Sequence, residues 1–353
     1  MDKNGSIIKR QRTMLWIFAV MIVALLAIVL ALILSKKSTS QESLVTQTDQ
    51  PAVLDPTATL VITATDVASI QITPVPEEQA TATPTIAALT VGSTRISEID
   101  GMEQVFVPAG EFLMGTNDVE AKRDIEGGRA YPEIPQFTYT LDDFWIDKYE
   151  VTNQQYHACM DAGACSEPHR IGSYTYPDYF TNAVYDNYPV VWVNWFQATD
   201  YCEWAGRRLP TEAEWEKAAR GVDGRKYPWG DEPYSVDKAN ICDVNCTRTH
   251  SLPEYNDGFA DVAPIGSFPA GASPYGALDM AGNVWEWNST EIMLYPYDAT
   301  DGREDPGGID VERGWRGSSW ANGLWWLRSS TRYHARDSYS WYVLGFRCAA
   351  NVE

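Results

Sequence analysis

The sequence has 353 residues, 44% of them apolar and 21% charged, which is long and apolar enough for at least one folded domain. Its 48 acidic residues outnumber its 27 basic ones, giving a net charge of −21 at pH 7. Six of the bases cluster in residues 1–37, so the rest of the chain is still more acidic and would be repelled by nucleic acid. We therefore expect no nucleic-acid partner.

Residues 14–34 form an unbroken apolar run without charge or proline. As a helix rising about 1.5 Å per residue, this run spans a hydrocarbon core of about 30 Å. It is longer than the apolar part of a signal peptide and ends at Lys36 and Lys37 instead of a cleavage site. Four bases precede it and two follow closely, which places residues 1–13 in the cytoplasm. The pattern predicts a single-pass cell-membrane protein with an extracytoplasmic C-terminal part.

Residues 35–98 are rich in Thr, Ser, Ala, Gln and Pro and contain no aromatic residue. Such a segment cannot bury enough apolar surface to offset the entropy lost on ordering. We predict a disordered stalk, whose ends would lie about 40 Å apart as a flexible coil. It would lift the remaining domain clear of the membrane surface.

Residues 99–353 contain the signals of a folded domain. Residues 100–116 alternate apolar with other residues around a Pro-Ala-Gly turn, which predicts a β-hairpin. Thr152 is a suitable N-cap for a following helix. Two more helices are expected on either side of the break between Gly206 and Pro210, and a capping box at Thr211–Glu214 starts the second.

Six short motifs along this domain together resemble the formylglycine-generating (sulfatase-modifying factor) family. In chain order they are Pro108-Ala109-Gly110 with Met114-Gly115, Glu150–Asn153, Arg208–Glu216, Tyr227–Gly230, Gly282–Trp287 and Leu344–Arg347. The resemblance implies an α+β fold related to C-type lectins, with little regular secondary structure. Such an interior has to be filled by Trp and Tyr side chains, of which the chain has 14 and 19.

Two turn-rich stretches carry the oxygen ligands that calcium prefers, namely carboxylates, amides and backbone carbonyls. The resemblance implies calcium sites at the same positions. The first set is Asn240, Ile241, Asp257 and Phe259, and the second is Asp279, Gly282, Val284 and Glu286. The alternative is that Asp257 belongs to an ordinary turn and Glu286 is a solvated acid. We expect calcium as a bound cation.

The six cysteines, placed on the exported side of a membrane, indicate three disulfides, for which fifteen pairings exist. Cys159 with Cys165 and Cys242 with Cys246 each enclose a short loop. That leaves Cys202 with Cys348, and the resemblance supports this pair because the family joins the corresponding cysteines.

Enzymes of the family hold copper(I) through two thiols, in a stretch Gly-Gly-Ser-aromatic-x-Cys followed five residues later by a second Cys. Copper(I) is soft and selects thiolates. In this chain the first thiol position is Asn322 and the second is Leu327, so copper is not expected. Trp285 and Ser319 match residues around the family's active site, and Trp320 follows, so a degenerate cleft is expected to persist.

The missing thiols favour a membrane-tethered binding or scaffolding module, stabilised by calcium and without copper-dependent oxidase activity. Its ligand would be an extracellular protein or a glycan. One alternative is an active protein-modifying oxidase, formylglycine-generating or related, that uses a non-standard site. Another is a lectin-like carbohydrate binder, which follows from fold and calcium sites alone, and a fold does not establish a function.

Overall fold

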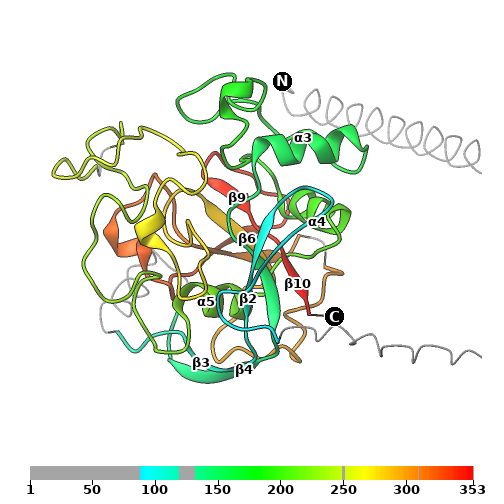
Figure 1. The fold of residues 1–353 in the computed structure, drawn as a ribbon, viewed down its shortest axis with the longest axis vertical. Helices are drawn as coiled ribbons and strands as arrows, with labels where there is room; N and C mark the ends of the chain where they lie inside the picture. Colours follow the sequence, from blue (N-terminus) through cyan, green and yellow to red (C-terminus); the bar gives the residue numbers. More distant parts are fainter. Residues whose placement is uncertain (1–87, 119–131, 249–250, 309, 353) are drawn as a thin grey trace, which may run out of the picture. The chain divides into compact units, whose positions relative to one another are not determined.

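The computed structural model describes residues 88–118, 132–248, 251–308 and 310–352 (Figure 1). All of these residues belong to one compact unit of the chain, residues 82–353. The predicted membrane segment 14–34, the cytoplasmic residues 1–13 and the predicted stalk up to residue 87 lie outside the described residues. Within the described ranges, no helix is both long enough and apolar enough to cross a bilayer.

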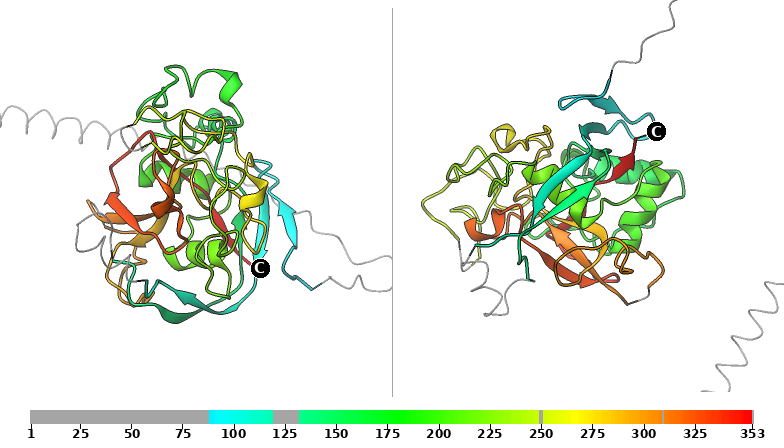
Figure 2. Two further views of the ribbon diagram at one scale, coloured as in Figure 1. Left: turned by 90° about the vertical axis from the view of Figure 1, so that its left-hand side faces the viewer. Right: turned by 90° about the horizontal axis from the view of Figure 1, so that it is seen from below.

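One four-stranded sheet joins the beginning of the described chain to its end, as both views of Figure 2 show. All its strand pairs are antiparallel. Its strands, in spatial order, are β1 (Thr94–Ile96), β2 (Glu103–Val107), β5 (Phe144–Asp147) and β10 (Ala349–Asn351). Because the last strand pairs with β5, folding of this sheet requires nearly the whole domain.

The folded domain begins earlier than the sequence pattern predicts. The pattern assigns everything up to residue 98 to a disordered stalk, but β1 pairs Thr94 with Val105 and Ile96 with Glu103. Two of its three residues are exposed, so composition gives little sign of order there. The strand is held by its ladder with β2 and not by burial, which sequence periodicity does not reveal.

A second sheet carries the central strands of the domain in the order β8-β7-β6-β9. The pair β6–β9 is parallel and the others are antiparallel. Its strands are β6 (Trp285–Glu291), β7 (Glu312–Arg316), β8 (Tyr333–Arg336) and β9 (Leu344–Phe346). A two-stranded sheet pairs β3 (Gly110–Met114) with β4 (Phe137–Leu141).

The hairpin predicted over residues 100–116 is wrong, although both of its strands exist. β2 pairs with β1 and β5, whereas β3 pairs with β4 in a different sheet. Pro108 has no N–H with which to continue a ladder. The carbonyls of Pro108 and Gly110 instead accept hydrogen bonds from Lys217 Nζ at 2.7 and 2.9 Å. The chain therefore turns a corner between two sheets at this point.

The three predicted helices are present, and two of them begin at the predicted Thr152 and Thr211. They are α3 (Asn153–Asp161), α4 (Trp195–Trp204) and α5 (Glu212–Arg220), with short 3₁₀ turns η1 (Ala183–Tyr185), η2 (Pro269–Gly271) and η3 (Leu324–Leu327). Capping boxes start all three α-helices, at Thr152, Asn194 and Thr211. The content of helix and strand is mixed, as expected of an α+β fold, and long stretches are irregular (Figure 1).

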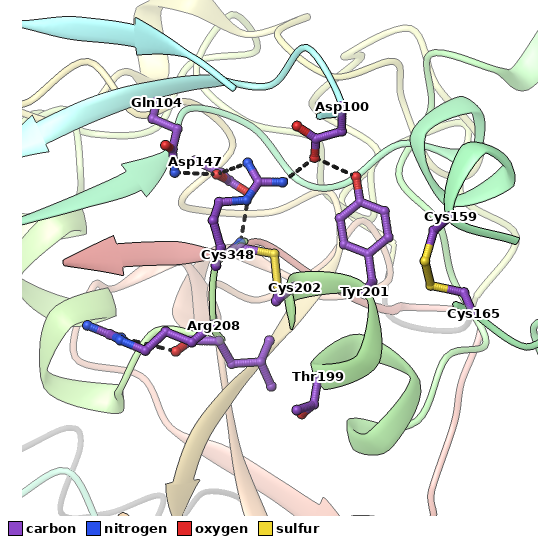
Figure 3. Close-up of a disulfide and its surroundings, with 12 residues drawn as sticks. Asp100, Gln104, Asp147, Cys159, Cys165, Thr199, Tyr201, Cys202, Arg208 and Cys348 are labelled. Carbon is purple, nitrogen blue, oxygen red and sulfur yellow. Dashed lines mark hydrogen bonds and ion pairs between the residues drawn. A yellow bond between two sulfur atoms is a disulfide. The ribbon is translucent and has the colours of Figure 1, made fainter. Parts of the chain in front are cut away.

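The structure joins the cysteines in the pairs expected from the sequence, Cys159–Cys165, Cys202–Cys348 and Cys242–Cys246. Beside Cys202–Cys348, two carboxylates share one guanidinium (Figure 3). Arg207 pairs with Asp100 and, at 2.8 Å, with Asp147. Burial raises the pKa of Asp147 to about 6, against the effect of Arg207 and of the Cys348 N–H that donates to it.

The interior of the domain is heavily charged around α5. Glu216 accepts hydrogen bonds from Arg316, Arg220 and the Gly115 N–H at 2.7–2.8 Å. Glu212 receives both Nε and Nη2 of Arg332. Burial alone would raise the pKa of Glu212, but Arg332 and Arg316 hold it below its ordinary value. These pairs connect α5 to β7 and to the segment after η3.

Replacing one member of this network is expected to leave buried charge without a partner. We predict that Glu216→Gln lowers the free energy of unfolding by about 3–5 kcal/mol, as for other broken buried ion pairs. Chemical denaturation monitored by tryptophan fluorescence measures the change. The matched control is Glu203→Gln on the exposed face of α4, where a change within about 0.5 kcal/mol is expected. Equal stability losses in the two variants would contradict the prediction.

Candidate functional site

The chain leaves β7 through two residues with left-handed backbone, Gly317 at φ 94° and Ser318 at φ 72°. A Cβ on Gly317 would lie 3.1 Å from the Trp215 ring, and the positive φ would strain any other residue, so glycine is favoured there. Ser318 stands where the family stretch has its second glycine. Its hydroxyl is buried, and no hydrogen-bond partner lies among the described residues. The turn is therefore kept although its second residue is poorly suited to it.

Asn322, at the first thiol position, is held by two neighbours that the sequence predicts to be near it. Its side-chain oxygen accepts hydrogen bonds from Ser319 Oγ at 2.6 Å and from Trp285 Nε1 at 3.0 Å. Its backbone carbonyl accepts from the Cys242 N–H at 2.9 Å. The structure thus brings Trp285, Ser319 and Asn322 together, with an amide where a thiol would be needed.

Leu327, at the second thiol position, is 1% exposed and packs against Ala239, Ile241 and Ala281. It is the last residue of η3. Every cysteine of the chain is in a disulfide, so none offers a thiol. An amide oxygen and an isobutyl group do not ligate copper(I), so the residues present do not fit this metal.

A continuous set of aromatic rings surrounds these residues. Trp326 lies edge-on to Trp285 at 6.0 Å and contacts Tyr333 at 6.1 Å. The Trp320 ring lies 5.5 Å from the Tyr174 ring and 6.0 Å from the Tyr342 ring. Tyr174 is 46% exposed, so the rings reach the surface of the molecule.

A surface pocket of 420 Å³ is formed by none of the predicted site residues. Its lining residues are Leu141, Asp142, Asp143, Arg208, Glu214, Asn351 and Val352. Arg208 is already paired with Glu214 at 2.6 Å and with Asn351 at 2.7 Å. Arg208, Glu214 and Asn351 of this pocket therefore satisfy one another.

The first calcium set converges in the structure. Asp257 accepts hydrogen bonds from the N–H groups of Ile241 and Phe259 at 2.8 and 2.9 Å. Asn240 Oδ1 is buried and has no hydrogen-bond partner among the described residues. Burial raises the pKa of Asp257 to about 7, and the nearby Asp243 acts in the same direction. The Asn240 oxygen lacks a hydrogen-bond donor, and burial disfavours the charged form of the Asp257 carboxylate. A hard cation such as calcium would stabilise both groups.

The second set fits less well. Asp279 and Gly282 have left-handed backbone in a tight turn, as expected. Glu286, however, receives Arg347 Nε and Nη2 and Trp215 Nε1, each at 2.7 Å. The carboxylates of Glu150, Asp279 and Glu286 act on one another around Arg347, and burial together with this mutual repulsion raises the pKa of Asp279 to about 6. Glu286 is thus already committed to an ion pair.

Side-chain chemistry alone does not define a metal centre here. In the parts of the chain that the structure describes, no three His, Cys, Asp or Glu side chains are grouped to hold a metal ion. Calcium at either set would have to be held largely by backbone carbonyls, and at the first set also by the Asn240 amide.

Comparison with known proteins now places the chain in a family. The sequence profile of the sulfatase-modifying factor enzyme 1-like domain matches residues 92–352. The chain belongs to this family. The match begins at the turn before β1, in agreement with the earlier domain start seen in the structure.

Relatives within the sulfatase-modifying factor family include proteins named as active and as inactive. Formylglycine-generating enzyme of Mus musculus is 29% identical over 70% of this chain and 75% of its own length. Inactive C-alpha-formylglycine-generating enzyme 2 of Mus musculus is 31% identical over 70% of this chain and 85% of its own. The solved structure of PvdO from Pseudomonas aeruginosa superposes with a TM-score of 0.59 and 27% identity, covering 75% of this chain and all of that one.

Some features near the site could not be found from the sequence. Trp192 has a left-handed backbone at φ 63°, which is rare for a bulky residue. Arg170 lies over its ring at 4.9 Å, and Arg248 lies near Tyr174 and Tyr342. These residues come from four separate loops, and no local pattern marks their association.

Ser318 allows a direct test of how the degenerate turn is maintained. Ser318→Gly removes both the left-handed strain of a Cβ and a buried hydroxyl without a partner, against the greater chain entropy of glycine. We predict a gain of about 1 kcal/mol in the free energy of unfolding, measured by denaturant titration. Ser318→Ala is the control, because it removes the hydroxyl but keeps the strained Cβ, and its gain should be smaller. A loss of stability in Ser318→Gly would refute this account.

Proposed function

We propose that this protein is a non-oxidising member of its family that works as a binding or scaffolding module. The observation that carries the proposal is the Asn322 side chain, whose oxygen is held by Trp285 and Ser319 where a copper thiolate would be required. Leu327 offers no ligand at the other position, and no cysteine is free to replace it. The aromatic and hydrogen-bonding residues that surround these two positions then support recognition more than redox chemistry.

Family membership alone leaves both activities open, because a relative named formylglycine-generating enzyme and one named inactive match this chain about equally well. The discrimination rests on the two substituted positions. The rival hypothesis, an active oxidase with a non-standard site, needs a soft-metal ligand set. The described residues contain no free thiol for such a set. The lectin-like alternative rests on the fold and on the proposed calcium sites alone, and a fold does not establish a function.

We further propose that residues 14–34 tether the domain to the cell membrane, with residues 1–13 in the cytoplasm and the domain outside. The apolar run and its flanking bases support the tether and its orientation. Three disulfides that use all six cysteines support an oxidising compartment for the domain.

We also propose calcium as a structural cation, held first of all by Asn240, Asp257 and the carbonyls of Ile241 and Phe259. The support is the orphan Asn240 oxygen and the half-buried Asp257 carboxylate, which accepts a hydrogen bond from the N–H of the next residue, Ile241. The second set would supply Asp279 and the carbonyls of Gly282 and Val284, with Glu286 shared with Arg347. Calcium would offset part of the buried negative charge there.

The absence of oxidase activity is tested with the full-length chain, copper(I), oxygen and a peptide of the form Cys-x-Pro-x-Arg. Mass spectrometry should find no conversion of the peptide cysteine to an aldehyde, because copper(I) lacks its thiolate ligands. A formylglycine-generating enzyme with both thiols, run in parallel, verifies the assay. Aldehyde formation by this chain would overturn the proposed function.

Calcium binding is tested by thermal unfolding with and without the ion. At about 100 times its dissociation constant, calcium adds about 2.7 kcal/mol, which raises the melting temperature of a domain this size by about 5–10 °C. Asp257→Asn should lose most of this increment. The matched control Asp237→Asn, at an exposed acid, should keep it. An unchanged increment in Asp257→Asn would exclude the first set as the site.

A further inference from the structure

Five residues form what we name the arginine–aromatic surface: Arg170, Tyr174, Trp192, Arg248 and Tyr342. Tyr342 is its centre, with the Tyr174 ring at 5.1 Å and the Trp192 ring at 5.9 Å. Arg170 lies over Trp192 at 4.9 Å, while Arg248 lies 5.9 Å from the Tyr342 ring and donates to the Tyr342 hydroxyl. The surface adjoins the degenerate site through Trp320, whose ring contacts both Tyr174 and Tyr342.

Both arginines differ from most others in the domain because they are not paired with an acid. Among the described residues, neither Arg170 nor Arg248 forms an ion pair. Carboxylates do pair with a large set of arginines, namely Arg207, Arg208, Arg220, Arg225, Arg303, Arg316, Arg328, Arg332, Arg336 and Arg347. In a chain with 48 acids and 27 bases, two unpaired guanidiniums beside one set of rings are an unexpected local excess of positive charge.

Asp261 is hydrogen-bonded to the loop that carries Tyr174, but it does not neutralise the positive charge of this surface. Asp261 accepts from Ser173 Oγ at 2.5 Å and from the Thr175 N–H at 2.7 Å, on either side of Tyr174. It is 1% exposed and accepts a further bond from the Val262 N–H. Asp261 therefore fixes the loop that carries Tyr174 and is directed into the protein, away from a ligand.

The backbone of the surface is strained at its centre, which is an independent sign of a functional role. Trp192 has φ 63°, a conformation that costs a bulky residue about 1–3 kcal/mol. The conformation is held by the Trp192 N–H, which donates to Trp341 O at 3.0 Å, and by its indole N–H, which donates to Gly172 O at 2.7 Å. The strain keeps the ring beneath Arg170 and half-exposed.

We propose that the arginine–aromatic surface binds an acidic segment of a partner protein, with Arg170 and Arg248 receiving its carboxylates. The inference rests on the proposed function and names the class of ligand for it. Guanidinium groups bind carboxylates with paired, directional hydrogen bonds. Tyr, Trp and Arg are also the side chains enriched at the centres of protein–protein interfaces. The exposed Tyr174 ring then contacts apolar atoms of the same segment.

A protein segment is favoured over a glycan by the charge and by the geometry. The rings of Tyr174 and Tyr342 are inclined to each other by 41°, and those of Trp192 and Tyr342 by 60°. The three rings therefore do not present one flat face on which successive sugar rings would stack. Inclined rings flanked by two guanidinium groups suit a peptide segment, whose successive side chains point in different directions.

The test measures binding of a fluorescently labelled oligoglutamate peptide to the full-length chain by anisotropy. Arg170→Gln, at an exposed residue, should weaken binding about 10-fold, and Arg170→Gln with Arg248→Gln should weaken it further. Arg225→Gln is the matched control, because that arginine is paired with Asp223 and touches none of the five residues. The bases of residues 1–37 are present in every variant and add an equal background.

Three results would overturn the inference: no binding above background, equal binding by wild type and Arg170→Gln, or binding of an oligogalacturonate in place of the peptide. Arg170→Gln keeps the test valid even if the half-buried Arg248 is needed for folding. The oxidation assay separates the two proposals. Aldehyde formation would refute the proposed function, whereas no aldehyde with no peptide binding would refute the acidic-ligand inference alone.

Discussion

Buried pairs of arginine and carboxylate hold the segment that carries the degenerate site. Arg316, before it, is fully buried and bonded to Glu216, and Arg328, after it, is bonded to Glu133 at 2.7 Å. Ion pairs of this kind need not add to stability relative to apolar residues, but neither partner can be removed cheaply. The eleven-residue stretch between them, residues 317–327, is irregular apart from η3. Buried ion pairs therefore hold this stretch in place at both of its ends.

This arrangement explains how the chemistry of the stretch can change while its shape persists. Asn322 replaces a thiolate ligand by an amide that Ser319 and Trp285 bind directly. Leu327 adds apolar burial beside Ile241 in the first calcium set. In this chain both positions are therefore occupied by side chains that serve local hydrogen bonding and packing. These contacts hold the stretch in place without a metal ion.

The sequence predicted those parts of the fold that depend on local signals. The N-cap at Thr152, the capping box at Thr211 and the helix break before Pro210 required only neighbouring residues. The hairpin failed because alternation identifies strands but not their partners, and Lys217, far along the chain, decides the corner at Pro108. The start of the folded domain was predicted wrongly for the same reason, because β1 is ordered by its pairing with β2.

In the candidate site too, the sequence predicted the placement of some residues and not of others. The resemblance predicted that Trp285, Ser319 and Asn322 lie close together, because relatives of one fold keep the relative placement of their motif residues. Leu327 was assigned to the same site, but its side chain contributes to a neighbouring apolar cluster. The association of Arg170 with Arg248 around Tyr342 was not foreseeable, because it depends on loops distant in sequence and on the left-handed Trp192.

The overall charge of the chain limits what the arginine–aromatic surface can do. A net charge of −21 repels an acidic partner at long range, but salt screens such repulsion beyond about 8 Å at physiological ionic strength. Within that distance Arg170 and Arg248 dominate, because Asp261 is buried and satisfied by the loop. Association would therefore lack electrostatic steering and be slow, while the complex, once formed, would be held by short-range charged hydrogen bonds. Selectivity would then reside in dissociation rates, which suits a stable scaffold better than a rapidly exchanging sensor.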